Sequence, residues 1–156
     1  MNKALFLTFD DTLVTTLSGR KHSLHGEDWK FINQAVYAVR DGIKEGYIVC
    51  LIINQSAIAN NFISEKTFIR KLELVLQTLE RDLKLKKNSI KYSYCIEEGS
   101  YHYLPNPGMV FELALEYELD IASSVLLGNS ELDRYTAKKC GIPNFVNVTE
   151  LTLSDI

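Results

Sequence analysis

The chain has 156 residues, of which 46% are hydrophobic and 24% charged, a balance that fits one globular domain with its own core. Its formal net charge of −3 gives no support to a broad nucleic-acid footprint, which would need a basic domain. The longest apolar stretch near the N-terminus, residues 4–9, is too short for a signal-peptide core or a membrane span. The three cysteines match no zinc spacing or disulfide framework, so we expect free thiols in the cytoplasm and no membrane partner.

Five short apolar runs predict strands. They are residues 4–9, 47–53, 90–96, 124–127 and 144–148. The first, second and fourth are nearly continuous in apolar residues, which is typical of strands covered on both faces. Helical patterns lie between the runs, and this alternation predicts an α/β fold with a doubly wound, Rossmann-like parallel sheet of five strands. We expect a single domain over residues 1–156.

Apolar residues at steps of three and four predict the helices between these strands. The first helix pattern begins at Trp29, and the second follows Ser64, which we expect to be its N-cap. Asn106 and Pro107 predict an N-cap followed by proline at the first helical position. Ser130 opens a capping box ahead of the last helix.

One long polar segment, residues 11–27, separates the first strand from the first helix. Its middle is basic and includes Arg20 and Lys21. Long connections of this kind are often functional, although a solvated hairpin is the simpler interpretation. In doubly wound sheets, ligands bind beyond the carboxyl ends of the strands, which is where this segment begins.

Four motifs stand at the predicted strand ends and helix starts. They are Thr8-Phe9-Asp10-Asp11-Thr12-Leu13, Ile53-Asn54-Gln55, Leu104-Pro105-Asn106-Pro107-Gly108-Met109, and Leu127-Gly128-Asn129 followed by Asp133. In this order they resemble the motifs Asp-x-Asp-Gly-Thr-Leu, Thr-Asn-Gln, Lys-Pro-x-Pro-Gly-Met and Val-Gly-Asp of the haloacid dehalogenase (HAD) superfamily. The branch that they resemble most contains polynucleotide 3′-phosphatases and histidinol- or heptose-phosphate phosphatases. The resemblance implies a HAD-like fold, and no large insertion suggests a cap domain.

The resemblance also implies a reaction, phosphoryl transfer to an aspartate with Mg²⁺, and several of its side chains are replaced here. The replaced positions in an ungapped alignment are Thr8 (nucleophile), Ile53 (phosphate-binding hydroxyl), Leu104 (lysine) and Asn129 (first metal carboxylate). Asp10, at the acid position, and Asp133 are retained. Asp10, Asn129 and Asp133 would make a weak metal set, so Mg²⁺ is doubtful. Asn54, Arg20 and Lys21 remain as candidate contacts to a phosphate or other ligand.

We therefore expect a HAD-like domain that is catalytically impaired and acts by binding a protein, a nucleic-acid end or a phosphorylated ligand. A first alternative is an active Mg²⁺-dependent phosphatase, for which a polynucleotide 3′-phosphate is one substrate. A rival alignment, in which one residue is deleted, would then make Asp10 the nucleophile, with Asp11 beside it. A second alternative is a structural module that forms homo-oligomers. Asp133 also has a plain structural interpretation, as a member of the capping box.

Overall fold

The structure, a computed structural model, describes residues 1–151. Its main sheet is parallel, has five strands as predicted, and has the order β5-β4-β1-β6-β7. The strands are β1 (Ala4–Leu7), β4 (Ile48–Asn54), β5 (Lys91–Cys95), β6 (Val125–Gly128) and β7 (Asn144–Asn147). Because the chain adds strands first on one side of β1 and then on the other, the carboxyl end of β1 lies at the switch point where such sheets bind ligands.

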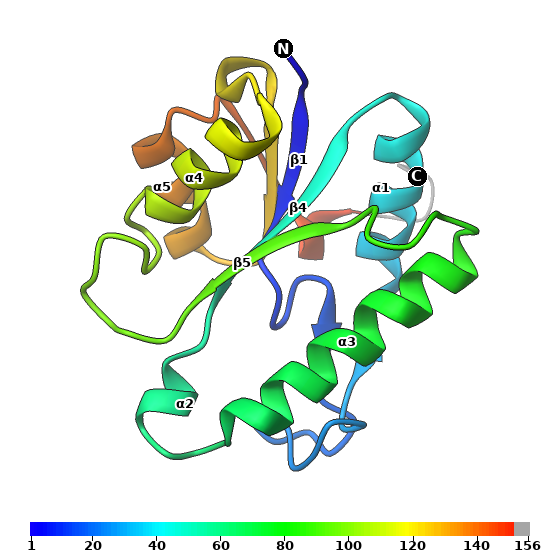
Figure 1. Ribbon diagram of the computed structural model, residues 1–156, viewed down its shortest axis with the longest axis vertical. Helices are drawn as coiled ribbons and strands as arrows, with labels where there is room; N and C mark the ends of the chain where they lie inside the picture. The colour runs from blue at the N-terminus through cyan, green and yellow to red at the C-terminus, as the bar shows by residue number, and fades with distance from the viewer. Residues whose placement is uncertain (152–156) are drawn as a thin grey trace.

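Two helices cover each face of the sheet (Figure 1). Side chains of α1 (Asn33–Lys44) and α3 (Glu65–Asp82) pack in one core cluster. Those of α4 (Gly108–Tyr117) and α5 (Glu131–Cys140) pack in a second cluster on the opposite face. Three short helical turns complete the chain, namely α2 (Ser56–Ala59), η1 (Ile121–Ser123) and η2 (Val148–Glu150).

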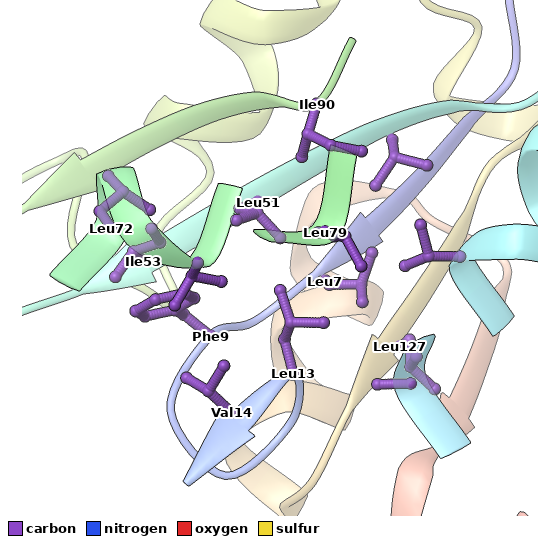
Figure 2. Close-up of a cluster of buried hydrophobic side chains, with 14 of the residues drawn as sticks. Leu7, Phe9, Leu13, Val14, Leu51, Ile53, Leu72, Leu79, Ile90 and Leu127 are labelled. Atoms are coloured by element: carbon purple, nitrogen blue, oxygen red, sulfur yellow. The ribbon is translucent and has the colours of Figure 1, made fainter. Parts of the chain in front are cut away.

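The alternation of side chains along β1 explains why both faces are apolar. Leu5 and Leu7 belong to the cluster under α1 and α3, whereas Ala4 and Phe6 belong to the cluster under α4 and α5. Figure 2 shows the first cluster, where Leu7 lies among side chains from β4, β6 and α3. The prediction of strands covered on both faces is confirmed by this arrangement.

A second, two-stranded antiparallel sheet was not predicted. It pairs β2 (Val14–Thr15) with β3 (Lys30–Phe31). The expectation that Trp29 begins the first helix was wrong, because residues 30–31 pair with β2 and the helix starts only at Asn33. The apolar spacing around Trp29 reflects packing against the core from extended chain rather than a helical face.

The predicted helix caps gave mixed results. Ser64 and Ser130 are N-caps, each accepting a hydrogen bond from the backbone N–H three residues on. Asn106 is not a cap, because α4 begins one residue later than predicted, with Pro107 at the N-cap. The Asn106 amide donates instead to the carbonyl of Ser100, at 2.8 Å. Among residues 1–151, no helix combines the length and the apolar character needed to cross a membrane.

Candidate active site

A cleft of about 160 Å³ opens at the carboxyl ends of β1, β4 and β6. All six positions that the family resemblance singled out line it, namely Thr8, Asp10, Ile53, Leu104, Asn129 and Asp133. The fold therefore brings together residues that are separated by up to 125 positions in the sequence. Phe9, Ile52, Asn54 and Leu132 complete the lining, so the cleft contains two carboxylates and no lysine, arginine or histidine from the described residues.

Thr8 follows directly after β1 and faces the floor of this cleft. It is only 7% exposed, and its hydroxyl donates to Oδ2 of Asp133 at 2.8 Å. The same hydroxyl oxygen lies 2.6 Å from the hydroxyl of Thr12. Because the single proton of Thr8 goes to Asp133, Thr12 is the donor in that second bond. Asn129 in turn donates to Thr12 at 2.8 Å, which completes a hydrogen-bonded chain from Asn129 through Thr12 and Thr8 to Asp133.

The Asp10 carboxylate is engaged in an ion pair outside this chain. Its Oδ1 accepts from Nζ of Lys71 at 2.9 Å, and its Oδ2 accepts from Gln55 at 3.2 Å. Lys71 belongs to α3 and is 3% exposed, and its ammonium lies 5.4 Å from the centre of the Phe9 ring. Sequence reasoning missed Lys71. The available signal was a lysine directly before Leu72, within the apolar stripe of α3.

Asp11 adopts a left-handed backbone conformation, with φ of 64°. That region favours glycine, and glycine is the residue that the family motif Asp-x-Asp-Gly-Thr-Leu carries at this position. The turn is closed by a hydrogen bond from the Asp11 N–H to the carbonyl of Val14, at 2.7 Å. The backbone turn of the motif is thus present, and it agrees with the ungapped alignment that puts Thr8 at the position of the first aspartate.

Ile53 and Leu104 form an apolar wall of the cleft and are 1% and 3% exposed. Asn54, a candidate ligand contact, is used to hold this wall in place. Its amide donates to the carbonyl of Leu104 at 3.0 Å and accepts from the Leu104 N–H at 2.8 Å. The Leu104–Pro105 peptide bond is cis. Both ends of the Asn54 amide are therefore committed to the backbone of the neighbouring loop.

Asp133 is buried at the start of α5. Burial raises the pKa of its carboxyl group, and hydrogen bonds from the Asn129 N–H and the Thr8 hydroxyl offset this only in part. A side chain at Gly128 would come within 2.5 Å of Asp133, so glycine is what allows the carboxylate to lie so close to the end of β6. The Asn129 side chain donates to the carbonyl of Asp10, at 3.0 Å.

The donor set at the cleft does not fit Mg²⁺, which prefers several anionic oxygen ligands. Asp10 is paired with Lys71, and Asn129 uses its Nδ2 as a donor to two oxygens of the first motif. Asp133 accepts two hydrogen bonds on one of its oxygens. Within the described part of the chain, no three His, Cys, Asp or Glu side chains form a group that could hold a metal ion.

Arg20 and Lys21 do not line the cleft. They belong to the loop of residues 16–29, hereafter the flap, which lines a separate pocket against the start of α3. Asp28 organises the flap, because its buried carboxylate accepts from the Ser18 N–H, the Ser18 hydroxyl and the Leu24 N–H at 2.7 to 2.8 Å. Burial alone would raise the pKa of Asp28, but these hydrogen bonds outweigh burial and lower it to about 2.

Known proteins resemble this chain over most of its length. The family model described as "Polynucleotide kinase 3 phosphatase" matches residues 3–131. A D-glycero-beta-D-manno-heptose-1,7-bisphosphate 7-phosphatase of Haemophilus influenzae is 33% identical over 141 residues, which is 85% of this chain and 74% of the relative. A protein of the same description from Pasteurella multocida is 30% identical over 155 residues, covering 95% of this chain and 82% of the relative.

Solved structures show the same fold. A HAD-like phosphatase of Mesorhizobium loti has a TM-score of 0.75 at 22% identity and covers 90% of this chain and 69% of its own. The D,D-heptose 1,7-bisphosphate phosphatase of B. bronchiseptica, crystallised with magnesium and phosphate, has a TM-score of 0.74 at 20% identity and covers 89% and 76%. Together with the ordered motifs around one cleft, these matches show that the chain belongs to the polynucleotide kinase 3 phosphatase family of the HAD superfamily.

Proposed function

We propose that this phosphatase-fold domain is catalytically impaired at its own cleft and acts by binding. The observation that carries the proposal is the hydrogen-bonded chain at the floor of the cleft. Thr8 stands where the family has its nucleophile, and its hydroxyl both donates to Asp133 and accepts from Thr12. A neutral hydroxyl that is satisfied in this way is a poor substitute for a free carboxylate.

The electrostatics of the cleft support the same proposal. Phosphoryl transfer develops negative charge on the transferred oxygens, and catalysis depends on cations placed to stabilise it. Leu104 occupies the lysine position, and the nearby ammonium of Lys71 is already paired with Asp10. A phosphate in the cleft would therefore meet the Asp133 carboxylate without a cation from the lining side chains.

The comparisons favour a second candidate, an active phosphatase. The relatives at 33% and 30% identity are described as heptose-bisphosphate phosphatases, and neither description mentions a loss of activity. The proposal that the cleft is catalytically impaired rests on the residues of the cleft alone. The second candidate also has a nucleophile and base in contact, because Asp133 accepts a hydrogen bond from the Thr8 hydroxyl. A sugar phosphate would be its substrate.

Turnover by matched variants separates the two candidates. The substrates are p-nitrophenyl phosphate, heptose 1,7-bisphosphate and a 3′-phosphorylated oligonucleotide, each with Mg²⁺. If the cleft is impaired, the chain and its Thr8→Ala variant have the same rate, equal to the background without protein. Turnover above background that is lost either in both Thr8→Ala and Asp133→Asn or in Asp10→Asn would overturn this proposal and establish the second candidate.

A further inference from the structure

A second pocket lies beside the cleft, between the flap and the chain that leads from α2 into α3. Its volume is about 530 Å³, within the usual range for small-molecule sites. Flap residues 20–24 form one wall and residues 62–64 with Thr67 form the other, and no residue lines both this pocket and the cleft. The flap, α2 and the start of α3 all lie at the end of the sheet where β1 and β4 terminate (Figure 1).

The pocket carries unpaired positive charge on a chain whose net charge is negative. Arg20 and Lys21 are exposed, and no carboxylate of the described residues lies within 4.0 Å of either cationic group. Glu27, an exposed acid of the flap, is engaged elsewhere, since it pairs with His25 at 3.4 Å and with Arg70 at 3.9 Å. An anion that enters the pocket would therefore find cations without a partner.

An aromatic surface faces the same space. Phe62 is 68% exposed, more than Phe111 at 41%. Its ring stacks on that of His22, with centroids 5.2 Å apart and planes 21° apart. The stack joins the flap to the chain before α3 and leaves most of the Phe62 ring open to solvent. An exposed aromatic ring is the feature on which planar heterocycles stack.

The flap is built to hold these groups without a ligand. Asp28 gathers the backbone of Ser18 and Leu24 around one buried carboxylate, and the Thr16 hydroxyl donates to the carbonyl of Arg20 at 2.6 Å. A loop that is ordered beforehand loses little conformational freedom when it binds. The unpaired cations and the exposed ring are therefore presented by a fixed frame.

We propose that this pocket binds a nucleoside phosphate, with Arg20 and Lys21 on the phosphate and the Phe62–His22 stack on the base. Neither half of such a ligand alone would use both features. A small molecule fits better than a polymer, because the charge comes from two adjacent residues, Arg20 and Lys21, whereas single strands are held along extended basic grooves. The inference does not depend on whether the cleft is active.

Calorimetric titration of the whole chain with AMP tests the proposal, with adenosine, inorganic phosphate and a single-stranded oligoadenylate as the other ligands. We expect saturable binding of AMP, and binding of adenosine and of phosphate at least tenfold weaker. Phe62→Ala, and Arg20→Ala combined with Lys21→Ala, should each weaken AMP binding roughly tenfold, as the loss of one stacking or ionic contact does. These side chains are exposed, so the melting temperature should stay unchanged.

Three control variants have matched chemistry at other places. Phe111→Ala removes another exposed phenylalanine, Lys86→Ala with Lys87→Ala removes two exposed cations beyond the end of α3, and Asn129→Asp alters the cleft. None should change AMP affinity. Three results would overturn the proposal. They are the absence of AMP binding, binding of phosphate that is as tight as that of AMP, and a loss of AMP affinity in Asn129→Asp without one in Phe62→Ala. Oligoadenylate binding far more tightly than AMP, with a steep salt dependence, would replace it with a single-strand site.

Discussion

The cleft and the flap lie at the same end of the sheet, but they differ in whether their polar and charged side chains are already paired with one another. In the cleft, Asn129, Thr12, Thr8 and Asp133 satisfy one another, and Asp10 is neutralised by a buried lysine. In the flap, a buried carboxylate satisfies the backbone and leaves the cations Arg20 and Lys21 free toward solvent. A group whose hydrogen bonds are already made has little to offer a ligand, whereas an unpaired cation can still form an ionic contact with one.

This comparison also separates the backbone of a motif from its chemistry. Asp11 makes the left-handed turn that the family makes with glycine, and Gly128 still leaves room for the last-motif carboxylate. In the ungapped alignment, the family motifs carry a hydroxyl and a lysine at the positions of Ile53 and Leu104, and both of these side chains belong to the apolar core here. A fold can thus keep the backbone geometry of a motif while apolar side chains stand at positions where its relatives have polar ones.

The largest expected effect comes from restoring the four replaced side chains together, as Thr8→Asp, Ile53→Thr, Leu104→Lys and Asn129→Asp. If these replacements are what impairs the cleft, hydrolysis of p-nitrophenyl phosphate with Mg²⁺ should rise by a factor on the order of 100 or more, since loss of a catalytic unit can cost far more. A matched variant with Thr8→Asn in place of Thr8→Asp should stay at background. Melting curves show whether each variant folds, and equal rates in two folded variants would contradict the assignment of Thr8.

Removing the anchor of the flap should have one of the two largest effects on stability. Asp28→Ala removes a buried carboxylate that accepts three hydrogen bonds from Ser18 and Leu24, so we expect the free energy of unfolding to fall by about 3 kcal/mol. Urea denaturation measures the loss. Glu131→Ala, at a side chain that is 86% exposed, is the control and should change stability by less than about 0.5 kcal/mol. A similar small change in Asp28→Ala would show that the flap does not depend on this carboxylate.

The ion pair between Asp10 and Lys71 should respond unequally to removal of its two members. The lysine side chain is 4% exposed and the aspartate side chain 41% exposed. Asp10→Ala leaves a buried ammonium without its partner and should cost about 3 kcal/mol, whereas Lys71→Met leaves a carboxylate that water reaches and should cost about 1 kcal/mol. Equilibrium unfolding of both variants checks the order. Equal costs would mean that the ammonium finds another acceptor in the variant.

The sheet could be predicted from the sequence because β1, β4 and β6 are nearly continuous apolar runs that alternate with helical patterns. The six cleft positions could be predicted because the motifs stand at strand ends and helix starts. Lys71 could not, since nothing in a helical stripe indicates that one lysine turns inward to a carboxylate 61 residues away. Phe62 likewise gives no local signal, because its role depends on a stacking partner in the flap. The paired strands β2 and β3 were not predicted, because a strand of two residues is too short to show a recognisable periodicity.

The smallest expected effect is a difference in acid stability between the two buried carboxyl groups. The folded-state pKa of Asp28 is about 2, below the ordinary 3.8, so its contribution to stability is complete above about pH 4 and is lost as pH falls toward about pH 2. The pKa of Asp133 is raised by burial, so protonation of Asp133 in acid stabilises the fold and opposes that loss. Asp28→Asn should therefore make the decline of the unfolding free energy with falling pH shallower, and Asp133→Asn should make it steeper. Urea titrations at several pH values measure both slopes, and because only the slopes are compared, a constant loss of stability in either variant does not affect the result. Parallel slopes in the chain and both variants would show that these two carboxyl groups do not determine its response to acid.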